Sequence, residues 1–158
     1  MTPLILQEKL SLDIVRIFKG DTFKDSQGKD VPLNIFHQYR PIRKDEDEPD
    51  PVPYAIVRIL EGTVKGWTEA QEVQVMIILG CADDGEENSG HKTVLGMIQK
   101  IEERFMKNPM LANQFMFLND DQHPFGWALQ DEESFPYFFG AVSMTFKTAA
   151  IRTEDKYA

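Results

Sequence analysis

The chain has 158 residues, of which 42% are hydrophobic and 27% are charged, and its formal net charge is −9. This length suits a single domain, residues 1–158, with a core of its own, and the composition is typical of folded globular proteins. Lysine and arginine form no cluster. The acidic chain is therefore a poor candidate for sequence-specific binding to DNA or RNA, or for attraction to an anionic membrane surface.

The first part of the chain predicts one helix, an extended segment and a long loop. Residues 4–18 have the spacing of an amphipathic helix, and Gly20 follows where a helix stop is expected. The apolar stripe of this helix consists of Leu6, Leu10, Ile14 and Ile17. Residues 19–30 are polar and predict a loop, and residues 31–39 look extended. Residues 40–53 contain four prolines and five acidic residues, so we expect an exposed loop that is mobile in the isolated subunit.

The rest of the chain predicts a hairpin, a second helix and three further strands. Residues 54–61 and 69–79 favour two antiparallel strands joined by a short polar turn. An acidic loop at 82–90 precedes a helix over 91–107, which ends before Pro109. Further strands are predicted at 114–118, 125–130 and 137–148. This order predicts an α+β fold, with a mostly antiparallel sheet and the two main helices packed on one side of it.

Catalytic and metal-binding patterns are missing from the sequence. The three histidines, His37, His91 and His123, are far apart and fit no short metal-ligand spacing. The acidic residues form runs in predicted loops, where carboxylates are solvated, whereas acid–base catalysis needs carboxylates on rigid elements. No nucleophile, phosphate-loop or dinucleotide motif is present. We therefore predict a protein without enzymatic activity, cofactor or metal.

The single cysteine and the aromatic residues are explained by packing. Cys81 follows an apolar run and has no basic neighbour, which predicts a buried side chain and not a reactive thiol. The Phe135–Phe139 run packs in the core by default, but it is aromatic enough for part of it to be buried against another subunit. No apolar run approaches the roughly 20 residues needed to span a bilayer, so we expect no membrane partner.

Four segments, taken in order, resemble one known group of proteins. They are PDPVPYAIVRILEG at 49–62, EVQVMIILGCADDG at 72–85, GHKTVLGMIQKIEERFMKNPML at 90–111 and WALQDEESFPYFFGAVSMTFKTAAIRTED at 127–155. Within the last segment, the P-Y-x-x-G motif and the closing I-R-x-E-D are the most characteristic. The combination is similar to the tail terminators and minor tail proteins, which join tail to head, of long-tailed phages and prophages.

The resemblance implies a structural virion protein that forms a ring, usually a hexamer, on the last layer of the tail tube protein. Such a ring stops tube growth, presents a surface to the head connector protein, and lets DNA pass without specific binding. It also implies that the protein is made in the host cytoplasm and resides at the head-proximal end of the tail. A net charge of −9 on each copy suits a lumen that repels DNA. Two alternatives are another head–tail connector, such as a stopper or adaptor, and a small α+β enzyme or ligand-binding domain.

Polar and aromatic residues near strand ends are our candidates for contacts with another subunit or with the tube. Residues at strand ends are free to reach a partner, whereas residues in the middle of a sheet are covered by their neighbours. The candidates are Glu61, Lys65, Trp67 and Glu69 at the hairpin tip, and Arg152, Glu154 and Asp155 in the closing segment.

Overall fold

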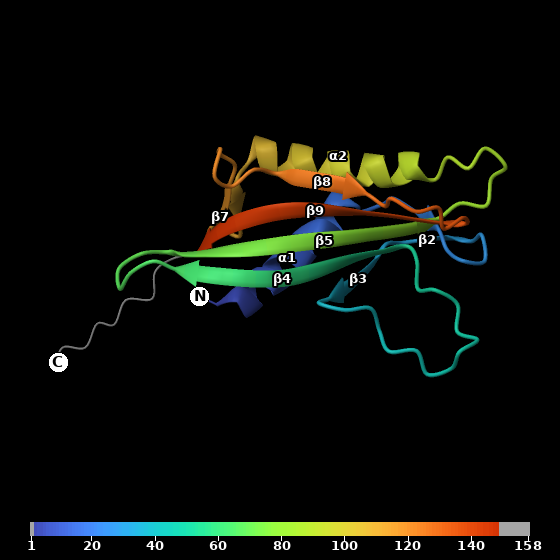
Figure 1. Ribbon diagram of the computed structural model, residues 1–158, viewed down its shortest axis with the longest axis horizontal. Helices are drawn as coiled ribbons and strands as arrows, with labels where there is room; N and C mark the ends of the chain where they lie inside the picture. The colour runs from blue at the N-terminus through green and yellow to red at the C-terminus, as the bar shows by residue number, and fades with distance from the viewer. Residues whose placement is uncertain (1, 149–158) are drawn as a thin grey trace.

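The computed structural model describes residues 2–148 and shows the α+β fold that the sequence predicts (Figure 1). The helices of this part of the chain are α1 (Pro3–Ile17) and α2 (His91–Lys107). The strands are β1 (Phe23–Lys24), β2 (Asp30–Val31), β3 (Asn34–His37), β4 (Tyr54–Val64), β5 (Gln71–Ala82), β6 (Met110–Leu111), β7 (Phe115–Leu118), β8 (Gly126–Leu129) and β9 (Tyr137–Thr148). Neither helix is long and apolar enough to cross a membrane, as far as residues 2–148 are concerned.

A seven-stranded sheet forms the centre of the molecule. Its order is β3-β4-β5-β9-β7-β6, and β8 pairs with β9 beside β7. Neighbouring strands are antiparallel except β3 and β4, which are parallel from Asn34↔Tyr54 to His37↔Val57. β5 lies between β4 and β9, as the apolar character of both its faces suggests. β1 and β2 form a separate small hairpin.

α1 begins with a capped turn and packs through one apolar stripe. The hydroxyl oxygen of Thr2 accepts the Ile5 N–H at 3.3 Å, and Pro3 occupies the first turn, where an N–H would have no helical partner. The buried apolar residues of the stripe are Leu6, Leu10 and Ile14. Gly20 follows the helix with a φ of +86°, which glycine adopts without strain.

α2 has the bounds that its apolar stripe predicts, residues 91–107. The stripe residues Val94, Ile98, Ile101 and Phe105 are all buried. The helix lies very close to β9 at Gly140, where an added Cβ would lie 2.7 Å from the Val94 side chain. The small residue in β9 therefore allows α2 to settle on the sheet.

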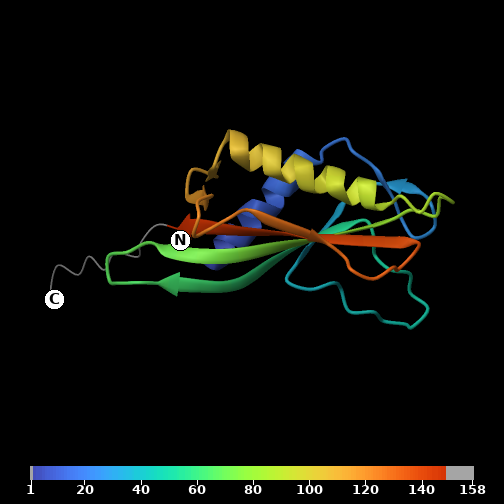
Figure 2. The same cartoon turned by 45° about the horizontal axis from the view of Figure 1, so that its top comes forward.

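Both helices lie on the same side of the sheet, as predicted (Figure 2). The main core between helices and sheet takes alternate residues of the long strands: Ala55 and Val57 of β4, Val73, Val75, Ile77 and Leu79 of β5, and Val142, Met144 and Phe146 of β9. Asp13 of α1 and Arg104 of α2 connect the two helices, with 2.9 Å between Oδ2 and Nε. Each large aliphatic side chain buried here contributes about 1.5–3 kcal/mol to stability. Most of the buried apolar residues of the described chain lie on this face of the sheet.

The opposite face of the sheet carries no helix of the described chain and only a small apolar cluster. Its buried members are Val52, Tyr54, Ile56 and Ala82, with Phe36, Ile78, Tyr137 and Phe139 packed against them. Strand alternation in β9 divides the aromatic run between the two faces, because Phe138 packs against the main core. Phe135, just before β9, is 51% exposed.

The chain between β3 and β4 leaves the sheet and returns through the proline-rich segment. Residues 41–49 are exposed as predicted, but Val52 and Pro53, immediately before β4, are buried. Asp50 contacts two arginines of the segment, Arg40 at 3.2 Å and Arg43 at 3.8 Å. The mobility of this segment in the isolated subunit stays a prediction.

Several parts of the sheet differ from the predicted elements. The loop predicted at 19–30 contains β1 and the start of β2, and α2 is followed by β6. These strands have two residues each, too few to show a periodicity. The extended segment predicted at 31–39 is divided between β2 and β3. The hairpin is longer than predicted, because β4 continues to Val64.

Candidate interaction site

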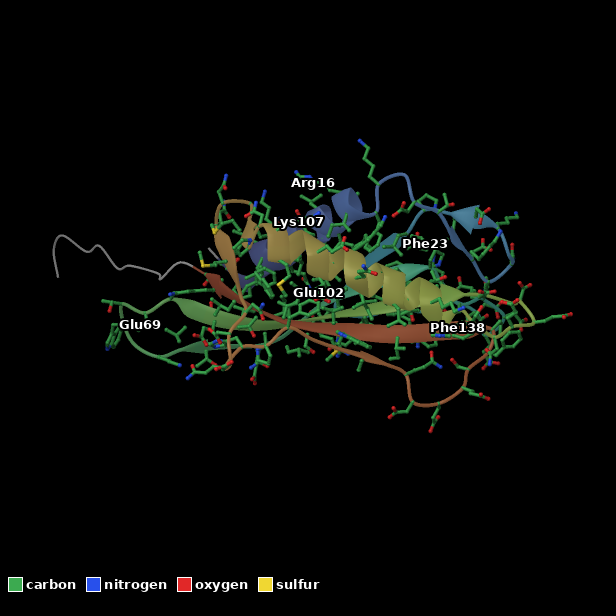
Figure 3. The ribbon with its side chains drawn as sticks, turned by 90° about the horizontal axis from the view of Figure 1, so that it is seen from above. Arg16, Phe23, Glu69, Glu102, Lys107 and Phe138 are labelled. Atoms are coloured by element: carbon green, nitrogen blue, oxygen red, sulfur yellow. The ribbon has the colours of Figure 1, made fainter. Side chains whose placement is uncertain are left out.

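The β4–β5 hairpin ends in a tip, residues 65–70, that extends past both helices (Figure 3). Within the tip, the Glu69 N–H donates a hydrogen bond to the Gly66 carbonyl at 3.2 Å. The four residues predicted as contacts on this hairpin, Glu61, Lys65, Trp67 and Glu69, are all exposed. The structure therefore brings this half of the predicted site together on one protruding element.

Trp67 dominates the tip because it is 96% exposed. Two apolar residues of β4, Val64 at 58% and Leu60 at 46%, are exposed on the same half of the hairpin. Removing such side chains from water is favourable by roughly 25 cal/mol per Å² of apolar area. The tip and the adjoining part of β4 thus expose three apolar side chains, and the charged residues Lys65 and Glu69 lie in the tip as well.

The outer edge of β4 is unpaired along this half of the hairpin. β3 pairs with β4 only as far as Val57, and the register of the hairpin shifts between Ile59 and Glu61. Beyond the shift, no strand within residues 2–148 pairs with this edge. The free backbone groups of an edge strand can pair with a strand of another chain.

Gln38 closes the inner part of the same edge. Its side-chain amide replaces a peptide group, because Nε2 donates to the Ile59 carbonyl at 2.8 Å and Oε1 accepts the Ile59 N–H at 3.0 Å. Gln7 of α1 holds this amide in place by donating to Gln38 Oε1 at 3.0 Å, and it also donates to the Val57 carbonyl at 2.8 Å. The edge is therefore satisfied up to Ile59 and open from residue 60 to residue 64. Sequence analysis missed this role, since a glutamine after a short strand has no distinguishing pattern.

The second half of the predicted site, Arg152, Glu154 and Asp155, lies outside the described residues. β9 ends at Thr148, which pairs with Gln71 of β5 and Phe115 of β7. The assignment of these three residues to an interface stays a prediction.

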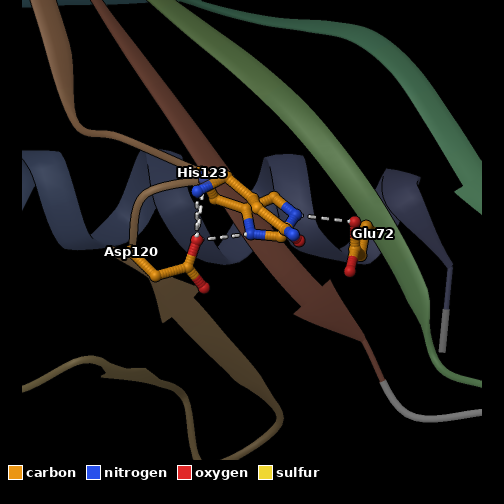
Figure 4. A network of polar contacts seen from close by, with 4 residues as sticks. Glu72, Asp120 and His123 are labelled. Carbon is orange, nitrogen blue, oxygen red and sulfur yellow. Dashed lines mark hydrogen bonds and ion pairs between the residues drawn. The ribbon is translucent and has the colours of Figure 1, made fainter.

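His123, in the loop between β7 and β8, lies between two carboxylates near the hairpin (Figure 4). Its Nε2 is 2.9 Å from Glu72 at the start of β5, and its Nδ1 is 2.9 Å from Asp120. The Glu72 contact, followed by the Asp120 contact, raises the pKa of His123, and the His123 contact lowers the pKa of Asp120. The cluster ties the β7–β8 loop to β5. His123 and Glu72 are 51 residues apart, so no local motif could show their contact.

The other histidines and the cysteine have unrelated surroundings. His37 Nε2 lies 2.8 Å from the Ser11 hydroxyl, and His91 is exposed at the start of α2. Cys81 is buried, as the sequence predicts. Burial, followed by the charge of Asp83, raises the pKa of its thiol to about 12. Across residues 2–148, no three His, Cys, Asp or Glu side chains are grouped so as to hold a metal ion.

Comparison with known proteins assigns the chain to no family. No family model matches the sequence, and no curated protein matches it. The phage-tail resemblance therefore rests only on the residues that carry it.

Proposed function

We propose that this protein is a non-enzymatic structural component of a phage virion, which caps the end of the tail tube as a ring and helps to join the tail to the head. The resemblance of residues 50–155 to tail terminators and minor tail proteins suggests this setting. The observation that carries the proposal is the 96% exposure of Trp67 at the end of a protruding hairpin.

Such exposure is expected of a protein that works by contact. Tryptophan is among the residues that contribute most to protein interfaces, and a fully solvated indole contributes nothing to the core of its own subunit. Val64 and Leu60 extend the apolar area along β4. A partner that covers the hairpin tip would bury side chains that the isolated subunit leaves in water.

The position of the hairpin suits a ring. In a closed cyclic assembly, each subunit presents one surface to one neighbour and a different surface to the other. The hairpin protrudes from one end of the sheet. In a ring it would therefore contact a surface other than the hairpin itself, either on the neighbouring copy or on the tail tube. The charge of −9 on each copy would repel DNA from the lumen, which fits DNA passing through without specific binding.

The test is a phage from which this protein has been deleted. We expect tails of uncontrolled length, or tails that fail to join heads, in electron micrographs of the lysate. Restoring the wild-type protein from a plasmid should restore tails of normal length. Ordinary headed tails of fixed length in the deletion phage would overturn the proposal.

The principal alternative, a stopper or adaptor protein, differs in its place in the particle. Both would form small acidic rings, so subunit structure alone does not separate them. Gold labelling of a tagged copy in complete particles should mark the junction on the tail-tube side. Label on the head side of the junction, on tailless heads, would favour a stopper or adaptor.

A further inference from the structure

A groove of about 410 Å³ lies on the helix-free face of the sheet, away from the hairpin tip. It opens between the chain that follows β3 and the surfaces of β4, β5 and β9. This groove, the Arg58 groove, is lined by Tyr39, Arg40 and Arg58, and by Tyr54, Ile56 and Phe139, which form its floor.

The floor of the Arg58 groove is apolar and held in place by packing. Tyr54 and Ile56 are 2% and 4% exposed, and the Tyr54 ring stacks on Phe139 with 6.4 Å between centroids. Gly80 lies under the same ring, because an added Cβ there would lie 2.8 Å from it. Burial and then the charge of Asp50 raise the pKa of Tyr54, as expected for a phenol away from water.

The two arginines of the groove differ in what compensates their charge. Arg40 donates to Asp50 at 3.2 Å. Arg58 extends over the Tyr39 ring, with 5.4 Å between its guanidinium carbon and the ring centroid. Within residues 2–148, Arg58 forms no ion pair, and its buried Nε has no hydrogen-bond acceptor. The buried Nε is closed to an acceptor from outside. The terminal N–H groups of Arg58 are not buried and have no acceptor within residues 2–148, so an acceptor on a partner can reach them.

We propose that the Arg58 groove binds a carboxylate side chain that a partner protein presents beside an apolar residue. The planar guanidinium of Arg58 matches a carboxylate, which can accept hydrogen bonds from two of its N–H groups. The apolar neighbour would cover the floor at Tyr54 and Phe139. This assignment does not depend on a role in phage tails.

A protein carboxylate fits the groove better than a nucleic acid. The chain has a net charge of −9, and the segment after Arg40 carries five acidic residues, so a polyanion would be repelled along most of its length. The unpaired guanidinium of Arg58 can bind one carboxylate. The apolar floor of the groove can pack against the apolar residue that the partner presents beside that carboxylate.

The test is a titration of the full-length, ¹⁵N-labelled protein with the capped tripeptide acetyl-Leu-Glu-Phe-amide, followed by NMR. The signals of the Arg58 Nε–H and of the Ile56 and Ile78 amides should shift and saturate. The matched peptide acetyl-Leu-Gln-Phe-amide should bind at least about tenfold more weakly, because it lacks the charge. Arg58→Gln should weaken binding of the Glu peptide by a similar factor. Arg16→Gln, on the exposed side of α1, is the matched control and should leave binding unchanged.

Three results would overturn the assignment. They are equal binding of the Glu and Gln peptides, unchanged binding in Arg58→Gln, and no saturable shift at the groove. If the groove signals shift with protein concentration alone, and Arg58→Gln removes that shift, the carboxylate comes from a second copy and not from a separate partner. This experiment uses only the subunit and a peptide. Failure of the peptide to bind would therefore leave the tail-capping proposal intact, and a normal deletion phage would leave the carboxylate assignment intact.

Discussion

The two halves of the β4–β5 hairpin share one ladder of hydrogen bonds, but they differ in the burial of their β4 side chains and in whether the outer edge of β4 is paired. In the inner half, residues 54–57 are all buried, with the main core on one side and the small aromatic cluster on the other. In the outer half, Leu60, Val64 and Trp67 are exposed, and β4 has no outer neighbour within residues 2–148. The exposure is confined to the β4 side and the tip, because Val73 of β5, opposite Gly62, still belongs to the main core. We expect the buried residues of the hairpin to carry its stability, and we propose that the exposed part of β4 and the tip contact a partner.

The largest effect is expected when a charge enters the buried part of the hairpin. Val75 of β5 is 1% exposed, so Val75→Asp would bury an unpaired carboxylate at a cost of several kcal/mol. We expect unfolded or insoluble protein in circular dichroism and urea titration. Gln74→Asp, at the exposed position beside it, is the control and should unfold near the wild-type midpoint. Near-normal melting of Val75→Asp would show that the buried face of β5 is not a source of stability.

A smaller effect is expected at the boundary between the two halves. Gln38→Leu removes the amide that satisfies both backbone groups of Ile59 and should cost about 1–3 kcal/mol. Hydrogen exchange of the Ile59 amide should become faster, while exchange of the Val57 amide changes less. Gln114→Leu, at an exposed position before β7, should affect neither measurement. An unchanged exchange rate at Ile59 would show that Gln38 does not close the edge.

The smallest effect on stability is expected from His123, which ties the β7–β8 loop to the outer half at Glu72. The contacts with Glu72 and Asp120 raise the pKa of His123 above its ordinary value of 6.5. Its stabilising contribution is therefore complete below pH 6.5 and is lost as the pH rises through the raised pKa. From about pH 6 to about pH 8, the urea midpoint of the wild type should fall more than that of His123→Gln. His91→Gln should keep the wild-type profile, and identical profiles for all three proteins would mean that the cluster adds nothing.

The predictable parts of the fold are those with a long repeating pattern. The α2 stripe from Val94 to Phe105, followed by Pro109, predicts the helix, and the alternation along 137–148 predicts β9 with its observed bounds. The parallel pairing of β3 with β4 is not predictable, because a long irregular segment separates them and no local pattern records the register. The same reason applies to the Gln38–Ile59 and His123–Glu72 contacts, which join distant parts of the chain.

The candidate site shows the same division. Trp67, Lys65 and Glu69 lie in a turn between two strong strands, so their exposure follows from their place in the sequence. The open edge of β4 does not follow, since it depends on where β3 stops and on the side chain of Gln38. The Arg58 groove was also beyond sequence analysis, because its walls and floor come from several segments brought together by the sheet.

The most direct test of contact through the outer half is the mass of the particles that the purified protein forms, alone and on isolated tail tubes. The wild type should assemble into a ring several times the subunit mass of 18.2 kDa. Trp67→Ala should remain folded but lose most of this assembly, and Trp67→Ala combined with Arg152→Glu should lose more. Trp127→Ala, which removes a tryptophan that is 52% exposed in β8, is the matched control and should assemble normally. Wild-type protein that stays at 18.2 kDa under both conditions, or Trp67→Ala that forms the same rings as the wild type, would contradict the account.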